Sequence, residues 1–360
     1  MTHGPLLPRW TIVAPIVAWL LFGGTLFGLS GWFLMVVAAG LIGSVLSAVH
    51  HAEVVAHRVG EPFGTMVLAI AVTVIEVALI VSLMLAGGPE TTALARDTVF
   101  AAVMIILTGM VGVCLLVGGA HHGEQSFMLH GVSASLATLA AIVVLTLVLP
   151  NYTTSSPGPN FTGGQLSFIA VVALILYGTF VFAQAVRHRD YFLSADGVDE
   201  ATVHAVVPPN RIAIASGLLL FACLGVVVLL AKALGPTIER GVAAIGAPPA
   251  LVGVIIAAVV LFPEGLAALR AARANRLQTS LNLALGSALA SIGLTIPTVA
   301  IVSLVTGWKL TLGIDIMSTV LLMLSLFVAA ISLGTGRTTI LQGTVLLVIF
   351  ATYLFTTIVP

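Results

Sequence analysis

The feature that most constrains this 360-residue sequence is a series of long apolar runs separated by short polar breaks. A run of about 18 or more apolar residues is long enough to cross the hydrocarbon core of a bilayer as a helix. Within lipid such a helix satisfies all of its own backbone hydrogen bonds. The sequence therefore predicts an all-α integral membrane protein with about eleven transmembrane helices. The runs fall near residues 11–29, 31–49, 63–86, 98–118, 131–149, 166–186, 211–231, 249–269, 279–305, 311–332 and 339–358.

Composition supports the same class and excludes others. Hydrophobic residues make up 59% of the chain, mean hydropathy is +1.20, and only 7% of residues are charged, against about 25% in ordinary soluble domains. The formal net charge is zero, so neither a nucleic-acid surface nor an acidic partner is indicated. The expected surroundings are a lipid bilayer. The first apolar run has no small-residue cleavage site after it and is predicted to be a retained span rather than a signal peptide.

The basic residues indicate how the spans are oriented. With a cytoplasmic N-terminus, nine basic residues fall inside and four outside, as the positive-inside rule requires. The inside set is Arg9, Arg58, Arg187, Arg189, Arg211, Arg270, Arg273, Arg276 and Arg337, and the outside set is Arg96, Lys232, Arg240 and Lys309. All nine histidines also fall inside: His3, His50, His51, His57, His121, His122, His130, His188 and His204. They are either ordinary interfacial residues or sensors of cytosolic pH.

Two glutamates lie near the middle of apolar runs, Glu76 in VLAIAVTVIEVALI and Glu264 in IIAAVVLFPEGLAA. A carboxylate at that depth is costly, and it normally faces the bundle interior or an ion pathway. Pro263 has no backbone N–H and leaves a carbonyl oxygen one turn back without its helical partner. Carbonyl and carboxylate oxygens suit a hard cation such as Ca²⁺. The pattern predicts an ion site built from both runs.

The two glutamate runs belong to an internal repeat of opposite orientation. With the orientation above, the span that holds Glu76 runs outward and the span that holds Glu264 runs inward, as in the inverted repeats of many secondary transporters. After each glutamate the chain turns and re-enters the membrane. Laying the two re-entering spans on one another, with a gap of about three residues, puts Asp97 opposite Asn282. The predicted fold is one extra helix followed by two inverted five-helix repeats.

The segments VTVIEVALI and FPEGLAALRAARANRLQTSLNLALGSALASIGLTIP, with GEPFGT upstream and HHGEQSF after the fourth apolar run, resemble the cation/Ca²⁺ exchanger superfamily. The resemblance extends over nearly the whole chain and is strongest to the ChaA-type bacterial Ca²⁺/H⁺ antiporters. It implies a bacterial inner-membrane antiporter, not an enzyme, without a bound cofactor. The implied organisation is an N-terminal extra helix at 1–30, a first exchanger repeat at 31–186, a cytoplasmic linker at 187–210 and a second exchanger repeat at 211–360.

Both expected carboxyl groups lie in apolar surroundings and near one another, so they should hold protons near neutral pH until a cation displaces them. Competition between a cation and protons at one alternately accessible site is sufficient for exchange. Four further residues complete the predicted ion site, each with a simpler structural reading as a cap or a packing residue. They are Asn282 and Ser287 in the second repeat and Thr73 and Asp97 in the first.

The sequence is compatible with several functions. The leading prediction is export of cytosolic Ca²⁺ in exchange for protons, because two carboxylates favour a divalent ion. The main alternative is Na⁺/H⁺ or K⁺/H⁺ antiport for monovalent-cation and alkaline pH homeostasis. A passive channel is less compatible with a proton-titratable pair, and an intramembrane hydrolase built on the HisHisAlaGlu segment at 50–53 lacks a catalytic partner set. Stoichiometry and oligomeric state are not encoded in these patterns.

Overall fold

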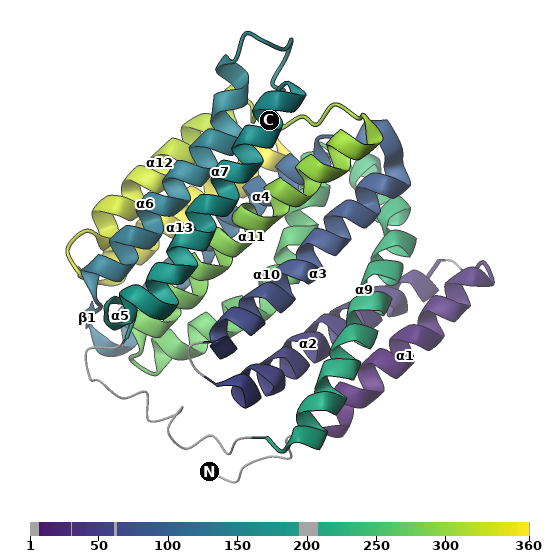
Figure 1. Ribbon diagram of the computed structural model, residues 1–360, viewed down its shortest axis with the longest axis horizontal. Coiled ribbons are helices and arrows are strands. Elements are labelled where there is room, and N and C mark those ends of the chain that lie inside the picture. The colour runs from purple at the N-terminus through teal and green to yellow at the C-terminus, as the bar shows by residue number, and fades with distance from the viewer. Residues whose placement is uncertain (1–6, 30, 61–62, 194–207, 360) are drawn as a thin grey trace. The chain divides into compact units, whose positions relative to one another are not determined.

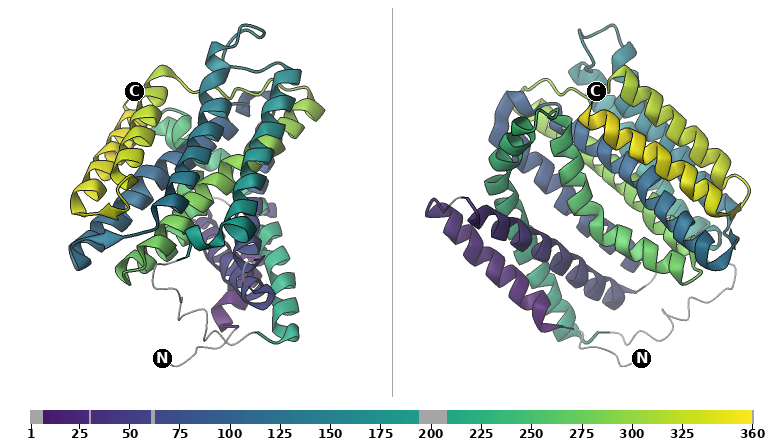
Figure 2. Two further views of the ribbon diagram at one scale, coloured as in Figure 1. Left: turned by 60° about the vertical axis from the view of Figure 1, so that its left-hand side comes forward. Right: turned by 180° about the vertical axis from the view of Figure 1, so that it is seen from behind.

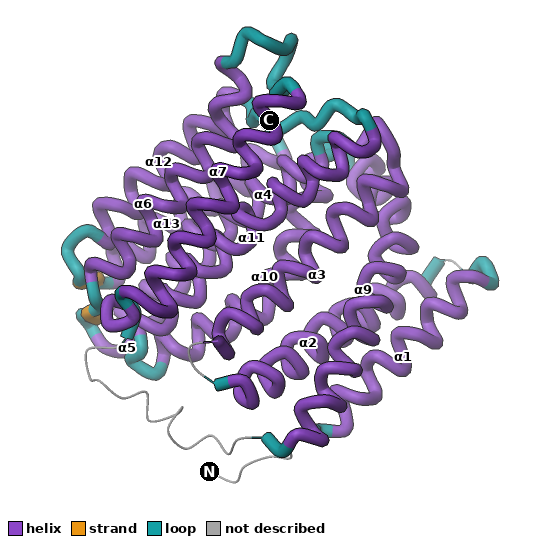
Figure 3. Tube along the Cα trace, viewed as in Figure 1, coloured by secondary structure: helices purple, strands orange, loops and turns teal. Residues whose placement is uncertain are grey.

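The computed structural model describes residues 7–29, 31–60, 63–193 and 208–359, and nearly all of them are helical (Figures 1 and 3). The elements are α1 (Arg9–Leu26), α2 (Phe33–Val59), α3 (Phe63–Gly87), η1 (Gly88–Thr91), α4 (Leu94–Met104), η2 (Ile105–Met110), α5 (Val111–His122), β1 (Gln125–Ser126), α6 (Leu129–Val143), η3 (Val144–Val148), η4 (Leu149–Tyr152), α7 (Gly163–Phe182), η5 (Ala183–Arg187), η6 (Arg189–Tyr191), α9 (Asn210–Ala244), α10 (Ala250–Arg273), α11 (Leu277–Thr306), α12 (Ile316–Leu333), β2 (Arg337–Thr338) and α13 (Ile340–Ile358).

The predicted all-α membrane fold is confirmed. Within the described residues ten helices are long and apolar enough to cross a membrane, and α3 adds a shorter apolar stretch at Ile70–Leu85. One span is composite, because the π-helical turn η2 joins α4 to α5, and π-helical or 3₁₀ turns extend α6 and α7 at their ends. One helix, α1, precedes five spans from α2 to α7, and five more follow from α9 to α13. His3, His204 and residues 194–207 of the predicted linker lie outside the described residues.

Within the described residues, a two-stranded antiparallel sheet is a departure from helix that the sequence did not suggest. Gln125 pairs with Thr338 and Ser126 with Arg337, so the connection after α5 is tied to the connection before α13. Figure 3 shows these strands in orange at one end of the helices. An exposed ion pair between Arg337 and Glu124, 3.0 Å long, lies beside them.

The chain divides into two compact units that do not coincide with the sequence repeats. The first unit holds Met1–Ala86 and Glu200–Ile245, and the second holds Gly87–Asp199 and Gly246–Pro360. Each unit therefore takes helices from both halves of the sequence. The predicted boundaries at 30, 186 and 210 refer to the repeats and stay a prediction.

In the first unit a proline determines how α1 is held. Pro15 lies inside α1 and has no N–H to bond the carbonyl of Thr11, four residues earlier. That carbonyl instead accepts hydrogen bonds from α2, 2.6 Å from Ser47 Oγ and 3.0 Å from Nε2 of the buried His51. Since a carbonyl can only accept, Nε2 of His51 carries the proton. Helices α1 and α2 lie side by side (Figure 2), and both contact α9.

In the second unit the long helices α6, α7, α11, α12 and α13 run alongside one another (Figure 1). Helix α11 is the most central of these, because it contacts α4, α5, α6, α7 and α10. Small residues permit the closest approaches. A Cβ on Gly293 would lie 2.8 Å from Cβ of Tyr177 on α7, so this glycine lets α7 pack directly on α11. The hairpin of α10 and α11 is thereby held inside the unit.

Candidate ion site

The candidate site in the second unit is centred on α10, where Glu264 lies in the interior of the helix. Pro263 is buried, and the helix continues through it. Because Pro263 supplies no N–H, the carbonyl of Val259 has no donor four residues on. Glu264 is half-buried, and its Oε2 atom is shielded from solvent. A carboxylate and a carbonyl without its helical N–H donor thus occur on neighbouring turns of one apolar helix.

Helix α11 returns antiparallel to α10 after a tight turn in which Asn275 adopts a positive φ of 58°. Because both helices rise about 1.5 Å per residue, Gly286 and Ser287 on α11 lie at the depth of Glu264 on α10. A Cβ on Gly286 would meet nothing within 4 Å, so open space adjoins the backbone there. Ser287 is half-buried. The predicted proximity of Ser287 to Glu264 agrees with this spacing, and its role as a ligand stays a prediction.

The third element beside Glu264 is the π-helical turn η2. A Cβ on Gly265 would lie 3.5 Å from Cε of Met110, the last residue of η2. Thr108 is fully buried in this turn, and its hydroxyl donates to the carbonyl of Met104. π-helical turns inside α-helices are frequently found at functional sites. The sequence prediction missed this segment, although LeuThrGly at 107–109 carries the same small and hydroxyl pair as LeuGlySer at 285–287 in reverse order.

Asp97 lies in the first turn of α4, which packs against α10 at a different depth from Glu264. Its backbone packs against Gly253 of α10, where an added Cβ would come within 2.8 Å of it. Gly253 is eleven residues before Glu264, which is about 16 Å along a helix. The structure therefore does not bring Asp97 to Glu264, and Thr108 is the residue of the α4–α5 span at the depth of that glutamate. Asp97 is held by Arg96, whose Nε lies 2.7 Å from Oδ1.

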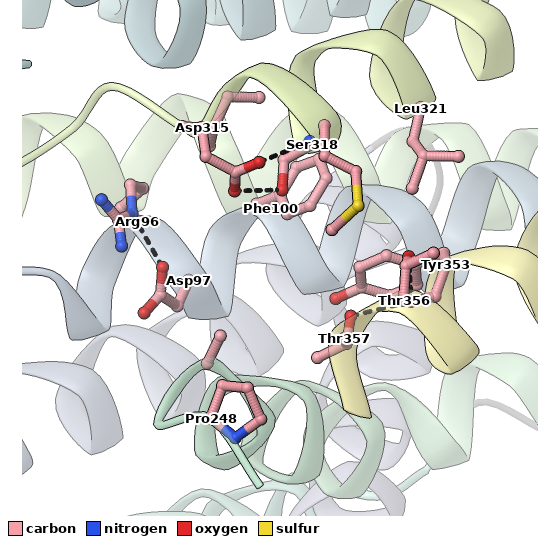
Figure 4. Close-up of a pocket in the computed structure, with 13 residues that line it drawn as sticks. Arg96, Asp97, Phe100, Pro248, Asp315, Ser318, Leu321, Tyr353, Thr356 and Thr357 are labelled. Carbon is pink, nitrogen blue, oxygen red and sulfur yellow. Dashed lines mark hydrogen bonds and ion pairs between the residues drawn. The ribbon is translucent and has the colours of Figure 1, made fainter. Parts of the chain in front are cut away.

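A cavity of about 140 Å³ opens beside Asp97 (Figure 4). Asp97 and Arg96 line one side, and Asp315 with Ser318 lines another. Arg96 also donates to the carbonyl of Gly313, 3.2 Å away. The ion pair therefore fixes the start of α4 to the connection between α11 and α12. Asp97 lies in the first turn of α4, whose N-cap is Ala93, so the simpler reading of Asp97 as the N-cap is wrong.

Asp315 caps α12 at the same cavity. Its Oδ1 accepts from the backbone N–H of Ser318 at 2.9 Å, and its Oδ2 accepts from the Ser318 hydroxyl at 2.7 Å. Burial acts to raise the pKa of Asp315, but these hydrogen bonds outweigh it and bring the pKa below its ordinary value. The stability from this cap is therefore complete above the ordinary pKa and is lost only as the pH falls through the lowered one.

Asn282 is near the start of α11 and is already engaged by protein groups. Its Oδ1 accepts from Nε2 of Gln278 at 2.9 Å, and its Nδ2 donates to the carbonyl of Phe192 at 2.6 Å. It lies four residues before Gly286, about 6 Å along the helix from the depth of Glu264. Its predicted role as an ion ligand is untested by this geometry.

Glu76 and Thr73 belong to the first unit. Both are buried on α3, with 2% of Glu76 and 4% of Thr73 exposed. Their spacing of three residues places them on one face of the helix. The carboxylate is thus held in the interior of an apolar span, as the sequence predicted. That Glu76 and Glu264 form one site stays a prediction.

The close packing of α4 on α10 gives a first testable expectation. A methyl group at Gly253 would lie 2.8 Å from the backbone of both Asp97 and Thr98, and backbone atoms cannot move aside singly. We expect Gly253→Ala to lower stability by about 1 to 3 kcal/mol, measured as a lower thermal unfolding midpoint in detergent. Gly217→Ala is the control, because a Cβ there meets nothing within 4 Å. Equal midpoints for the two variants would contradict this packing.

Comparison with known proteins agrees with the helical membrane fold. The family described as sodium/calcium exchanger protein matches residues 29–186 and 215–359. An ionic transporter of Sinorhizobium fredii, y4hA, is 48% identical over 357 residues, covering 98% of this chain and 97% of that protein. The sodium-potassium/proton antiporter ChaA of Escherichia coli is 35% identical over 319 residues, covering 88% of this chain and 86% of that protein.

A solved structure shows the same fold. The H⁺/Ca²⁺ exchanger CAX superimposes with a TM-score of 0.71 at 14% identity, covering 96% of this chain and 88% of that one. At that identity the likeness concerns the arrangement of helices alone. The two sequence matches extend over both glutamate-bearing spans. The chain therefore belongs to the sodium/calcium exchanger family, within the cation/Ca²⁺ exchanger superfamily.

Proposed function

We propose that this protein is a secondary antiporter that exports cytosolic Ca²⁺ in exchange for protons. The observation that carries the proposal is one carboxylate in the interior of an apolar span of each sequence repeat, Glu76 in α3 and Glu264 in α10. Two carboxylates match the charge of one divalent cation. The family description and the name of the CAX exchanger support the same ion.

The exchange follows from competition for these oxygens. When Ca²⁺ binds, both carboxylates are ionised and two protons leave; when Ca²⁺ departs, protons return and neutralise the buried charges. Access to the site alternates between the two sides of the membrane, and the site changes sides only when cation or protons compensate its charge. The proton gradient supplies the energy, so the mechanism calls for no resident cofactor.

The proposed setting is the inner membrane of a bacterium, with the N-terminus in the cytoplasm. The distribution of basic residues supports this orientation. The α10–α11 turn, with Arg270, Arg273 and Arg276, then faces the cytosol. Glu264 would meet outgoing cations from that side. The direction of transport follows from an inward proton gradient.

A second candidate is exchange of Na⁺ or K⁺ for protons. The sodium-potassium/proton antiporter ChaA, at 35% identity, favours it. The same two carboxylates would then bind one monovalent cation and retain one proton. A monovalent cation carries one charge fewer than Ca²⁺ and is attracted less strongly to the carboxylates. The cation concentration at half-maximal exchange rate would then be millimolar rather than micromolar.

Proteoliposomes with an imposed pH gradient decide between the two. We expect micromolar Ca²⁺ to collapse the gradient, and millimolar Na⁺ or K⁺ to do so weakly or not at all. Collapse by Na⁺ or K⁺ alone would replace the first candidate by the second. If none of the three cations moved protons, proton-coupled exchange of these ions would be excluded.

A further inference from the structure

A chain of hydrogen bonds connects Asn282 to two backbone groups outside its own helix. The backbone N–H of Met128 donates to Oε1 of Gln278 at 2.6 Å. Nε2 of Gln278 donates to Oδ1 of Asn282 at 2.9 Å, and Nδ2 of Asn282 donates to the carbonyl of Phe192 at 2.6 Å. Gln278 is buried, with 3% of its surface exposed. We call these four residues the amide relay.

The polarity of the amide relay is fixed from its two ends. A backbone N–H can only donate, so Met128 requires the oxygen of Gln278 and leaves its nitrogen for Asn282. A carbonyl can only accept, so Phe192 requires the nitrogen of Asn282 and leaves its oxygen for Gln278. Both conditions select the same orientation of both amides. Neither amide can flip without placing like groups against each other at two junctions.

The Phe192 end of the amide relay packs closely against Gly131 of α6. A Cβ on Gly131 would collide with the carbonyl oxygen of Tyr191 and would lie 3.2 Å from the ring of Phe192. The Phe192 ring also packs edge-on against Phe180 of α7, at a centroid distance of 5.9 Å. The carbonyl that ends the amide relay is therefore positioned by close packing, and any side chain at residue 131 would displace it.

The Met128 end of the amide relay belongs to the segment 122–128, which also hydrogen-bonds to the turn between α10 and α11. Gln125, which is buried, donates to the carbonyl of Ala272 at 3.2 Å and to Oδ1 of Asn275 at 2.8 Å. Nε2 of His122 lies 2.9 Å from the carbonyl of Arg273. The last carbonyls of α10 and the first turns of α11 are thus attached to residues 122–128 at one end of the unit.

From this geometry we propose that the amide relay is a latch on the candidate ion site, in which Gln278 and Asn282 act as positioning residues rather than as ion ligands. The latch joins the first turns of α11, the helix that carries Gly286 and Ser287, to the backbone at Met128 and Phe192. It stabilises the conformation seen here, through which each transport cycle passes. This inference rests on the proposed exchange activity and adds a structural control of its rate.

Two variants break the latch at different places. Gln278→Met removes both hydrogen bonds of the central amide but keeps its length and leaves Asn282 intact. Gly131→Ala displaces the carbonyl end without changing a relay side chain. The matched controls are Gln184→Met in η5, outside the relay, and Gly178→Ala in α7, where a Cβ meets nothing within 4 Å.

The readout separates rate from affinity. In proteoliposomes we expect the maximal exchange rate of each latch variant to fall about three- to tenfold, the population change that one hydrogen bond supports. The cation concentration at half-maximal rate should stay within about twofold, because no ligand has changed. The double variant should be no slower than the slower single one, because both break one latch. Hydrogen exchange of residues 188–193 should rise in Gln278→Met.

Normal rates in both latch variants would overturn the proposal. So would multiplied effects in the double variant, or a raised half-saturating concentration with unchanged hydrogen exchange, which would make the Gln278–Asn282 pair part of the ion site. The wild-type protein tests the proposed function separately, by whether Ca²⁺ moves protons at all. If only Na⁺ or K⁺ does so, the same variants are measured with that cation.

Discussion

Replacing Glu264 with Gln is expected to abolish cation/proton exchange, with a loss of about a hundredfold or more, while the protein remains folded in the membrane. The amide keeps the size of the side chain but neither binds a proton nor compensates a cation, and removing one charge from a buried arrangement costs several kcal/mol. The same outcome is expected for Glu76→Gln, since Glu76 is 2% exposed. The measurement is initial exchange rate in proteoliposomes at equal protein content.

The matched control for both is Glu239→Gln, because Glu239 is an exposed residue of α9. This variant should exchange at the wild-type rate. Retained exchange in both of the single variants at 76 and 264 would show that the two carboxylates are not the ion site. Loss in only one of them would leave a single-carboxylate site, which suits a monovalent cation better than Ca²⁺.

Replacing Pro263 with Ala is the second large effect expected. Alanine supplies the N–H that Pro263 lacks, so the carbonyl of Val259 gains its helical donor and is less available to a cation near Glu264. We expect the half-saturating cation concentration to rise about tenfold, which corresponds to the net value of one strong oxygen contact. Helix stability should rise in parallel, because an interior proline is costly. Cation dependence of the exchange rate measures the first effect, and thermal unfolding the second.

Pro236→Ala in α9 serves as the comparison, since Pro236 is also inside a helix but is exposed. It should gain stability without any change in cation dependence. If Pro263→Ala bound cations as well as the wild type, the carbonyl of Val259 would have no part in the site. The proline would then serve only to shape α10.

The spans could be predicted because apolarity over about twenty residues is a local property of the sequence. The orientation and the glutamate positions follow for the same reason, since each depends on a residue's place within its own run. No comparable local signal marks the π-helical turn at Ile105–Met110 or the strand pair at Gln125–Ser126 and Arg337–Thr338. Both are outcomes of packing between distant segments.

It was harder to predict which residues of the α4–α5 span lie at the depth of Glu264 on α10. The connection before α4 contains η1 and is longer than the three-residue turn between α10 and α11, so the re-entering spans were aligned by laying Ala101 and Ala102 on Gly286 and Ser287 with a gap. Asp97 was paired with Asn282 in that way, whereas packing against α10 brings Thr108 to the depth of Glu264 and leaves Asp97 at Gly253. Contact between helices sets this register.

The partners of Asn282 could not be predicted either, because two of the four groups in the amide relay are backbone atoms of Met128 and Phe192. Side-chain patterns carry no information about such groups. The sequence indicated that Asn282 was chemically significant, and the structure supplies what it bonds. Gln278, one turn earlier, was not singled out.

The central claim is that cations and protons compete for the two carboxylates. The direct test is calorimetric titration of the purified protein with Ca²⁺ in two buffers of different ionisation enthalpy, which counts the protons released for each ion bound. The account predicts release of about two protons for each Ca²⁺ bound near neutral pH, lost together with Ca²⁺ binding in Glu264→Gln. Binding of Ca²⁺ with the same enthalpy in both buffers, and so with no proton released, would contradict it.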